Sequence, residues 1–286
     1  MAERKAAEEV LEQALPDEPD PRANSGGVNI LFVGDVVGGI GRRTLLDSLP
    51  ILRERYAPTF VVVNAENSAG GLGVTPKIAD ELLAAGVDAI TLGNHTYHRR
   101  DVYPTLDREE RIVRPANYPK GNPGRGHTVV ERDGRRLGVV NLSGAVFMDV
   151  ARSPFAEIDA VLAELRDEAD HVLVDFHAEA TSEKIAMGWH LDGRVTACVG
   201  THTHVPTSDG RVLPGGTAYI SDAGMTGPRG GVIGVKREQA LVRFRTLMPV
   251  RFETSDEDPW LMAVLIDAGD DGKATAIEQL LVEAPG

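Results

Sequence analysis

Val28-Asn-Ile-Leu-Phe-Val33-Gly34-Asp35 joins an almost entirely apolar run to a glycine and a carboxylate. A strand with so few polar residues is typical of a parallel sheet that is covered on both faces. Phe60–Val63 and Val195–Val199 have the same character, and polar residues follow each of them. Ligands in open α/β sheets bind at the carboxyl ends of the strands. The stretch therefore predicts an α/β fold with a functional site at that edge.

Strand and helix patterns alternate along the rest of the chain, as they do in α/β folds. We expect helices at Arg42–Tyr56, Thr75–Ala85, Val102–Leu106, Ser153–Glu168 and Ser182–Met187. We expect further strands at Val87–Leu92, Val172–Phe176 and Thr217–Ser221, and a hairpin of His127–Glu131 with Arg136–Leu142. Gln239–Glu253 and Leu261–Asp267 alternate enough to predict strands on an edge or in a second sheet.

Two segments rich in glycine and proline, residues 114–126 and 222–231, interrupt this pattern. Long loops in compact domains are often functional. Arg114, Asn117, Arg125 and Arg229 lie in these loops, and two interpretations stay open for them. They either contact phosphate or base in a substrate, or they are ordinary surface residues.

The first 27 residues differ in composition from the rest of the chain. A charged segment is followed by a stretch rich in proline and glycine, which is typical of a linker. We therefore expect residues 1–27 to form a mobile N-terminal extension and residues 28–286 to form the functional domain.

Composition limits the classes of function. The chain has 286 residues and a net charge of −13, which argues against binding to extended nucleic acid. Its apolar runs are much shorter than the roughly 20 residues that a membrane span needs. Cys198 is the only cysteine, so we expect no disulfide framework and a cytoplasmic location. A homo-oligomer is compatible with this composition.

Five polar clusters directly follow apolar runs. They are Gly34-Asp35, Asn64-Ala-Glu66-Asn67, Gly93-Asn94-His95, Asp175-Phe-His177 and Gly200-Thr-His202-Thr-His204. Neighbouring strands lie only about 4.8 Å apart, so clusters distant in sequence can meet at one sheet edge. Carboxylate, amide and imidazole groups gathered in this way are typical of a hydrolytic site with two metal ions.

The residue types suit particular roles in such a site. Asp35 and Glu66 supply carboxylates, and Glu66 is placed to bridge two cations. Asn94 offers an amide oxygen, and Asn67 offers another. His177, His202 and His204 offer imidazoles, and this mixture of nitrogen and oxygen ligands suits Fe, Mn, Zn or Ni better than Ca or Mg.

The spacing of two histidines adds a geometric expectation. In an extended stretch, positions i and i+2 face the same way, so His202 and His204 would both point inward and Thr203 outward. His95 cannot easily turn to the same metal as its neighbour Asn94. It is better placed to protonate the leaving oxygen or to stabilise charge on the phosphoryl group.

The charge of such a site would suit a phosphate anion. Two divalent ions, two carboxylates and a shared hydroxide leave a net charge of about +1. Two metal ions about 3.5–4 Å apart activate the shared hydroxide for in-line attack on phosphorus. The residues therefore predict hydrolysis of small phosphate esters.

Each residue also has an ordinary structural interpretation. Asp35 could be a turn residue, His177 a buried core histidine, and a single His-x-His is a weak signal. The remaining histidines, His98, His127, His171 and His190, are expected to be structural or to lie on the surface. The shared position of all five clusters after apolar strands favours the functional interpretation.

Other classes of function compete with the metal site. A glycine-rich turn through Gly38, Gly39 and Gly41 after a strand imitates a dinucleotide-binding unit, but its spacing is wrong for Gly-x-Gly-x-x-Gly. The same turn lacks the Gly-Lys-Ser/Thr ending of a P-loop. A phosphomonoesterase or nucleotidase, and a regulator without enzymatic activity that senses metal or nucleotide, remain alternatives.

The clusters resemble the signature blocks of the calcineurin-like metallophosphoesterases, and most closely those of the YmdB-like bacterial phosphodiesterases. The resemblance also includes Arg114-Pro-Ala-Asn117 and the stretch Asp175–Lys184, and it extends from about residue 28 to the end of the chain. Val37 replaces the histidine found in most of the superfamily, and Glu66 replaces the usual bridging Asp. Both departures are features of the YmdB-like branch.

The resemblance implies a specific site and activity. One metal would be held by Asp35, Glu66, Asn67 and His204, and the other by Glu66, Asn94, His177 and His202, with His95 catalytic. It also implies a four-layer α/β/β/α sandwich. Iron is the implied metal, with manganese as the alternative, and the implied reaction is hydrolysis of cyclic-nucleotide phosphodiesters of the 2′,3′ or 3′,5′ type.

Overall fold

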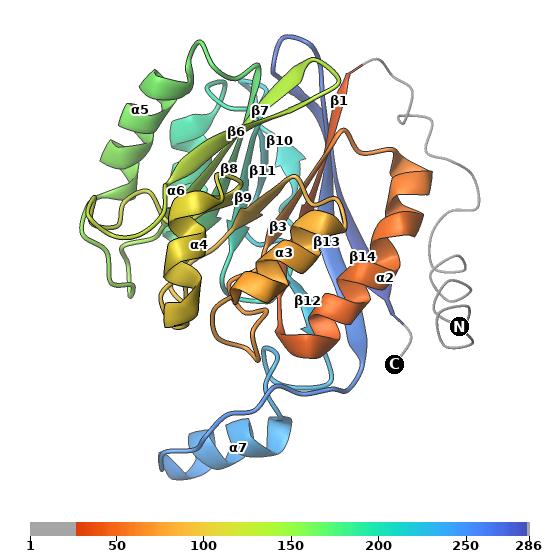
Figure 1. Cartoon of the computed structure of the whole chain (residues 1–286), viewed down its shortest axis with the longest axis vertical. Helices are drawn as coiled ribbons and strands as arrows, with labels where there is room; N and C mark the ends of the chain where they lie inside the picture. The colour runs from red at the N-terminus through yellow and green to blue at the C-terminus, as the bar shows by residue number, and fades with distance from the viewer. Residues whose placement is uncertain (1–26, 285–286) are drawn as a thin grey trace.

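Fourteen strands in the described part of the chain form two sheets (Figure 1). The computed structural model describes residues 27–284. The first sheet runs in the order β2 (Asp35–Val36), β12 (Met225–Pro228), β13 (Pro259–Ala268), β1 (Val28–Val33), β3 (Phe60–Asn64), β4 (Ala89–Thr91) and β5 (Ile112–Val113), with β14 (Ala274–Glu283) paired to β13. The second runs β10 (Arg211–Val212), β11 (Ala218–Ile220), β9 (Ala197–Thr201), β8 (His171–His177), β7 (Arg135–Ser143) and β6 (His127–Arg132).

The strands that precede the polar clusters are parallel within each sheet. In the first sheet β1 pairs with β3, and β3 pairs with β4, all in parallel. In the second sheet β7, β8 and β9 are parallel neighbours. Because parallel strands end at the same edge, this arrangement brings the polar clusters of each sheet together.

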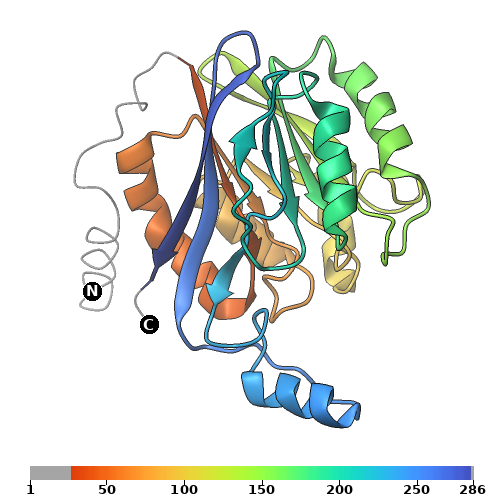
Figure 2. The ribbon, with the colours of Figure 1, turned by 180° about the vertical axis from the view of Figure 1, so that it is seen from behind.

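Six α-helices accompany the strands of residues 27–284. They are α2 (Gly38–Tyr56), α3 (Pro76–Ala84), α4 (Tyr103–Arg108), α5 (Pro154–Leu165), α6 (Thr181–Leu191) and α7 (Arg237–Thr246), and the short 3-10 turn η2 (Arg100–Val102) precedes α4. In Figures 1 and 2, α2 and α3 lie on one side of the molecule and α5 and α6 on the other. None of the helices between residues 27 and 284 combines the length and apolar composition needed to span a bilayer.

Buried apolar side chains form three clusters. Leu45 and Leu49 of α2 pack with Val61 and other residues of the first sheet. A second cluster joins the two sheets and includes Phe32, and a third lies under α5 and α6 and includes Phe176. Alternate residues of β1 and β3 therefore contribute to different clusters, which explains why these strands carry so few polar residues.

Helix ends follow local sequence signals in one case and tertiary packing in another. The Thr75 side chain accepts a hydrogen bond from the Ile78 amide at 3.4 Å, with Pro76 at the first position, as the sequence predicts for α3. In contrast, α2 begins at Gly38, four residues before its predicted start. Gly41 lies so close to the chain of β12 that a Cβ would come within 2.3 Å of the Thr226 carbonyl oxygen.

Three predictions about the C-terminal part need correction. The strand expected at Gln239–Glu253 is wrong, because Arg237–Thr246 forms the helix α7 and no regular element follows it up to residue 253. β12 lies inside the expected loop 222–231, and β14 has no predicted counterpart. α7 buries only Ala240 and projects from the body of the molecule (Figures 1 and 2), so it has no buried face whose period could reveal a helix.

The expectation of a mobile extension falls almost entirely outside the described residues. Residues 1–26 are not described, so that part stays a prediction. The first described strand, β1, begins at Val28.

Candidate metal centre

The seven predicted ligands converge where the carboxyl ends of the two sheets meet. Asp35 follows β1, Glu66 and Asn67 follow β3, Asn94 follows β4, His177 ends β8, and His202 and His204 follow β9. Asp35, Glu66, Asn67 and His177 are at most 3% exposed. The site is therefore built by strand ends from both sheets.

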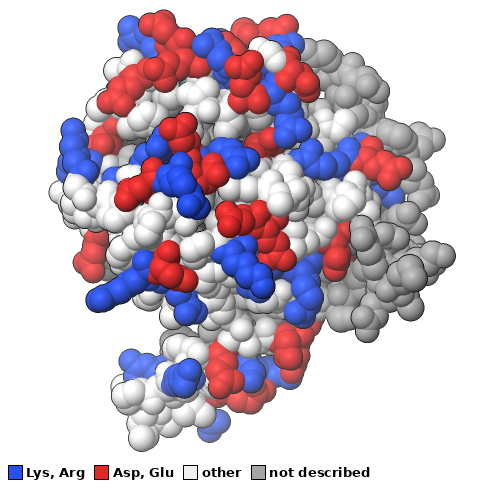
Figure 3. Space-filling model, viewed as in Figure 1, with Lys and Arg blue, Asp and Glu red and all other residues white. Residues whose placement is uncertain are grey.

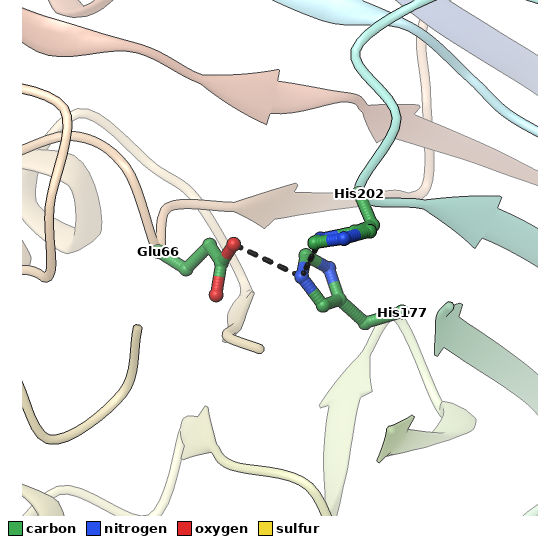
Figure 4. Close-up of side chains that lie close together, drawn as sticks. All are labelled: Glu66, His177 and His202. Carbon is green, nitrogen blue, oxygen red and sulfur yellow. Dashed lines mark hydrogen bonds and ion pairs between the residues drawn. The ribbon is translucent and has the colours of Figure 1, made fainter. Parts of the chain in front are cut away.

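One group of side chains surrounds a single nitrogen. His177 Nε2 lies 2.9 Å from Glu66 Oε1 and 3.0 Å from His202 Nδ1 (Figure 4). It also lies 2.8 Å from Asn94 Oδ1. A ring nitrogen carries at most one hydrogen and cannot satisfy three such partners at once. Carboxylate, imidazole and amide atoms that converge in this way are suitable ligands for a transition-metal ion.

A second group of side chains also contacts Glu66 Oε1. Asn67 Nδ2 is 3.2 Å from Glu66 Oε1 and 3.1 Å from His204 Nε2. His204 Nε2 is also 3.8 Å from Asp35 Oδ1. Glu66 therefore contacts members of both groups.

The unsatisfied oxygen of Asp35 shows that this donor set suits a cation. Asp35 is fully buried, and its Oδ1 has no hydrogen-bond partner among the described residues. Its Oδ2 accepts a hydrogen bond from the His202 amide at 3.1 Å. A buried carboxylate oxygen without a partner is costly unless it pairs with positive charge.

Gly93 allows the two sheets to approach each other at the site. A Cβ at this position would come within 2.4 Å of His177 Nε2 and 2.5 Å of Glu66 Oε2. Any side chain here would occupy the space between the ligands, so the glycine before Asn94 is a steric requirement of the cluster.

Both histidines after β9 point into the site, but for a reason that differs from the prediction. The extended stretch expected there is wrong, since φ is +99° at His202 and +65° at His204. Thr203 between them donates hydrogen bonds through its amide and hydroxyl to Asp222 Oδ2. Residues other than glycine rarely adopt such backbone conformations, and those that do are concentrated at functional sites.

A buried hydroxyl orients His177 from behind. Thr201 Oγ1 lies 2.9 Å from His177 Nδ1 and donates to Asp175 Oδ1 at 2.6 Å. Asn64 donates to the other oxygen of Asp175 at 2.9 Å. Burial raises the pKa of Asp175 to about 6, although these hydrogen bonds oppose the increase. Outer partners of this kind fix the orientation of metal-binding histidines.

Charges within the cluster are strongly coupled. Burial favours the neutral form of Glu66, but contact with His177 outweighs it and lowers the pKa of the carboxyl to about 2. Burial likewise opposes protonation of His177, yet Glu66 raises its pKa to about 9. Burial and the adjacent His177 lower the pKa of His202 to about 3, which keeps its imidazole neutral.

His95 lies at the rim of the cluster and is not among its inner ligands. Its backbone amide donates to Glu66 Oε2 at 2.9 Å, and its Nε2 is 3.4 Å from the Asn94 amide nitrogen. Burial lowers the pKa of His95. His98, which the sequence left as structural or surface, brings its Nδ1 within 3.3 Å of His95 Nδ1.

The four polar residues of the loops have other partners. Asn117 is fully buried and donates to the backbone oxygens of Ser143 and Arg152, and Arg114 is buried and donates to Pro115. Arg125 pairs with Glu110 and Arg229 with Asp258. Arg114 and Asn117 therefore hold the loop in place, and the structure does not support substrate contact by their side chains.

Solved structures define the class of protein. A protein from Thermus thermophilus, described as hypothetical, superimposes with a TM-score of 0.85 and 42% identity, covering 90% of this chain and 100% of that one. A novel phosphatase from Mycoplasma pneumoniae superimposes with a TM-score of 0.84 and 35% identity, covering 90% of this chain and 94% of that one. A putative 5′-nucleotidase from Staphylococcus aureus shares the fold at 15% identity and a TM-score of 0.56, covering 91% of this chain and 55% of that one. Together with the buried cluster, these matches define a phosphoesterase fold.

The family follows from the sequence comparison. The profile of the YmdB-like protein family matches residues 31–280, and the chain belongs to this family. A 2′,3′-cyclic-nucleotide 2′-phosphodiesterase from Bacillus subtilis is 47% identical over 256 residues, covering 89% of this chain and 97% of the relative. The chain is a hydrolase of phosphoric esters.

Proposed function

We propose that this chain is a two-metal phosphodiesterase that hydrolyses cyclic nucleotides. The convergence of Glu66, Asn94 and His202 on His177 Nε2 within 3.0 Å is the observation that carries the proposal. The buried Asp35 Oδ1, which has no hydrogen-bond partner among the described residues, supports it. The cyclic-nucleotide phosphodiesterase from B. subtilis supports the choice of substrate class.

The two groups of side chains suggest which residues hold each ion. Asp35, Glu66, Asn67 and His204 would hold one metal, and Glu66, Asn94, His177 and His202 would hold the other. Iron, or alternatively manganese, suits this mixture of carboxylate, amide and imidazole. When bound, the ions would supply positive charge for the phosphate and activate water at neutral pH.

The chain's own residues would divide the remaining work. Strand ends and Gly93 hold the ligands in place, and Thr201 orients His177. Water adds to phosphorus, the bond from phosphorus to a ribose oxygen breaks, and that oxygen takes a proton. His95 at the rim of the cluster is positioned to donate this proton, since a histidine with a lowered pKa is a stronger acid once it is protonated.

We infer a small substrate and not extended nucleic acid. The net charge of −13 supports this inference. Figure 3 shows Lys and Arg interspersed with Asp and Glu over the face in view, without a broad basic surface. We also infer a cytoplasmic enzyme, supported by the single buried cysteine, Cys198.

We also propose that the fold is a four-layer α/β/β/α sandwich. Three buried apolar clusters support this arrangement: one under α2 and α3, one between the sheets, and one under α5 and α6.

A substrate panel tests the proposed function. The metal-analysed protein is assayed with 2′,3′- and 3′,5′-cyclic nucleotides, 5′-nucleotides and p-nitrophenyl phosphate. We expect the highest kcat/KM for a cyclic nucleotide. Preference for monoesters would instead indicate the phosphomonoesterase alternative. Nucleotide binding without any turnover would indicate a regulator.

Replacing His95 tests its part in the reaction. We expect His95→Ala to keep its metal content but to lose roughly 10²- to 10⁴-fold in kcat, the range typical of a general acid. His190→Ala is the matched control, because His190 pairs with Asp159 on the surface. Hydrolysis of bis-p-nitrophenyl phosphate by His95→Ala at the parent rate would show that the assigned role is wrong.

A further inference from the structure

A cavity of about 470 Å³ has none of the proposed metal ligands among its lining residues. Tyr97 and Tyr118 line one part of it, and Asn122, Met148 and Asp149 line another. Tyr97 comes two residues after His95, so the cavity is close in sequence to the residue at the rim of the ligand cluster. The size falls within the range that is usual for small-molecule sites.

Tyr118 connects the cavity to the metal centre in space. Its neighbour Asn117 donates to the Ser143 carbonyl at 2.8 Å and accepts from the Ser143 amide at 2.9 Å, and Ser143, the last residue of β7, pairs with His177 across the β7–β8 ladder. Tyr118 is also close enough to Glu66 for that carboxylate to contribute to its raised pKa. A ligand with its phosphate at the metals could therefore extend into this cavity.

The two aromatic rings form a firmly held surface. Their centroids are 6.1 Å apart, with an angle of 33° between the ring planes. Tyr97 donates a hydrogen bond to the Pro123 carbonyl at 2.8 Å, and Tyr103 packs against its ring at a centroid distance of 5.5 Å. Rings fixed in this way can stack on a flat ligand without losing much conformational freedom.

The residues that line the cavity offer no positive charge to a phosphate group. No described Lys, Arg or His lines it, and its one charged residue is the exposed carboxylate of Asp149. The lining therefore favours an occupant that is uncharged or positive and has flat apolar faces. The Asp149 carboxylate and the Asn122 amide can accept hydrogen bonds from amino groups at the edge of such a ligand.

We propose that this cavity binds the nucleobase of the substrate, with Tyr97 and Tyr118 stacking on the ring and Asp149 selecting bases that carry an amino group. The proposal rests on the proposed function, since it assumes a nucleotide at the metal centre. It makes adenine, guanine and cytosine better ligands than uracil, which lacks an exocyclic amine.

Binding of nucleosides without phosphate tests the cavity independently of catalysis. Isothermal titration calorimetry of the full chain should detect adenosine but not ribose, and uridine should bind more weakly than adenosine. Tyr97→Leu should weaken adenosine binding about tenfold or more, whereas Tyr97→Phe, which keeps the ring, should bind as the parent does. Equal affinity of the Leu variant and the parent, or no adenosine binding at all, would overturn the proposal.

Asp149→Ala tests selection at an exposed position where misfolding is not a concern. Its preference for adenosine over uridine should fall at least threefold. An unchanged preference would show that Asp149 does not select the base.

Kinetics separate this proposal from the proposed function. The parent is compared on 2′,3′-cyclic AMP and on methyl riboside 2′,3′-cyclic phosphate, which has no base. Adenosine binding that depends on Tyr97, without turnover of either ester, would support base binding in the cavity and refute the proposed phosphodiesterase activity. Turnover of both esters with equal kcat/KM would support the phosphodiesterase and refute the cavity.

Discussion

At the scale of single residues, the site depends on side chains that cannot satisfy one another. His177 Nε2 has three polar atoms within 3.0 Å, and Asp35 Oδ1 has no hydrogen-bond partner among the described residues. Groups buried in this way normally destabilise a fold unless a cation compensates them. The same features therefore connect the chemistry of the site with the stability of the protein.

Thr201 provides a residue-scale test of this view. Thr201→Val keeps the shape of the side chain but removes the hydroxyl between His177 and Asp175. We expect metal affinity to fall roughly 10- to 100-fold, the usual cost of losing an outer partner. Competition with a chelator measures the change. Thr201→Ser should restore the parent affinity, and equal affinity of the Val variant would contradict the assigned role.

The residues of the site were predictable from sequence to different degrees. All seven predicted ligands meet in one cluster because each lies at or shortly after the carboxyl end of a strand. The role of Thr201 gives no sequence signal, since a threonine between Gly200 and His202 resembles any loop residue. The environment of Tyr97 and Tyr118 depends on packing between distant loops, which no local pattern encodes.

At the scale of elements, strand ends position the chemistry. β4 ends at Thr91, and the residues that follow carry Gly93, Asn94 and His95 into the space between the sheets. The absence of a side chain at Gly93 brings this segment within reach of His177 and Glu66. The strand and the turn after it therefore act as one unit.

Gly93→Ala tests this unit directly. A methyl group would lie within 2.5 Å of atoms of both His177 and Glu66, so the ligands must move apart. We expect bound metal, measured by elemental analysis, to fall below one ion per chain. Gly121→Ala is the matched control, because a Cβ at Gly121 meets no atom within 4 Å. Parent metal content in Gly93→Ala would contradict the steric argument.

Elements were predictable where burial imposes a period on the sequence. The strands β1, β3 and β9 and the helices α2 and α3 carry clear apolar patterns, and each was expected within a few residues. α7 was mistaken for a strand because its one buried side chain, Ala240, gives no helical period. β12 is not predicted, because the glycines that allow its close packing are typical of a loop.

At the scale of the whole molecule, the two sheets pack against each other, and among the helices of residues 27–284, α7 stands apart from them. α7 and the residues after it expose several large apolar side chains, among them Phe244 at 74% and Leu247 at 77%. The projection is visible in Figures 1 and 2. These side chains contribute little to the stability of an isolated chain.

Substitutions in this helix test that statement. Phe244→Ser combined with Leu247→Ser should change Tm by less than about 2 °C, because exposed side chains contribute little free energy of unfolding. Leu49→Ala, at a position that is 2% exposed, should lower Tm by several degrees in the same thermal scan. A comparable decrease in Tm for the double variant would show that Phe244 and Leu247 are buried against another chain.

The metal content of the purified protein tests the central claim most directly. We predict two transition-metal ions per chain in the parent and almost none in Glu66→Ala, because Glu66 contacts both groups of ligands. His190→Ala should keep both ions, because His190 pairs with Asp159 and contacts none of the ligands. Two ions per chain retained by Glu66→Ala, or no more than one in the parent, would contradict the account.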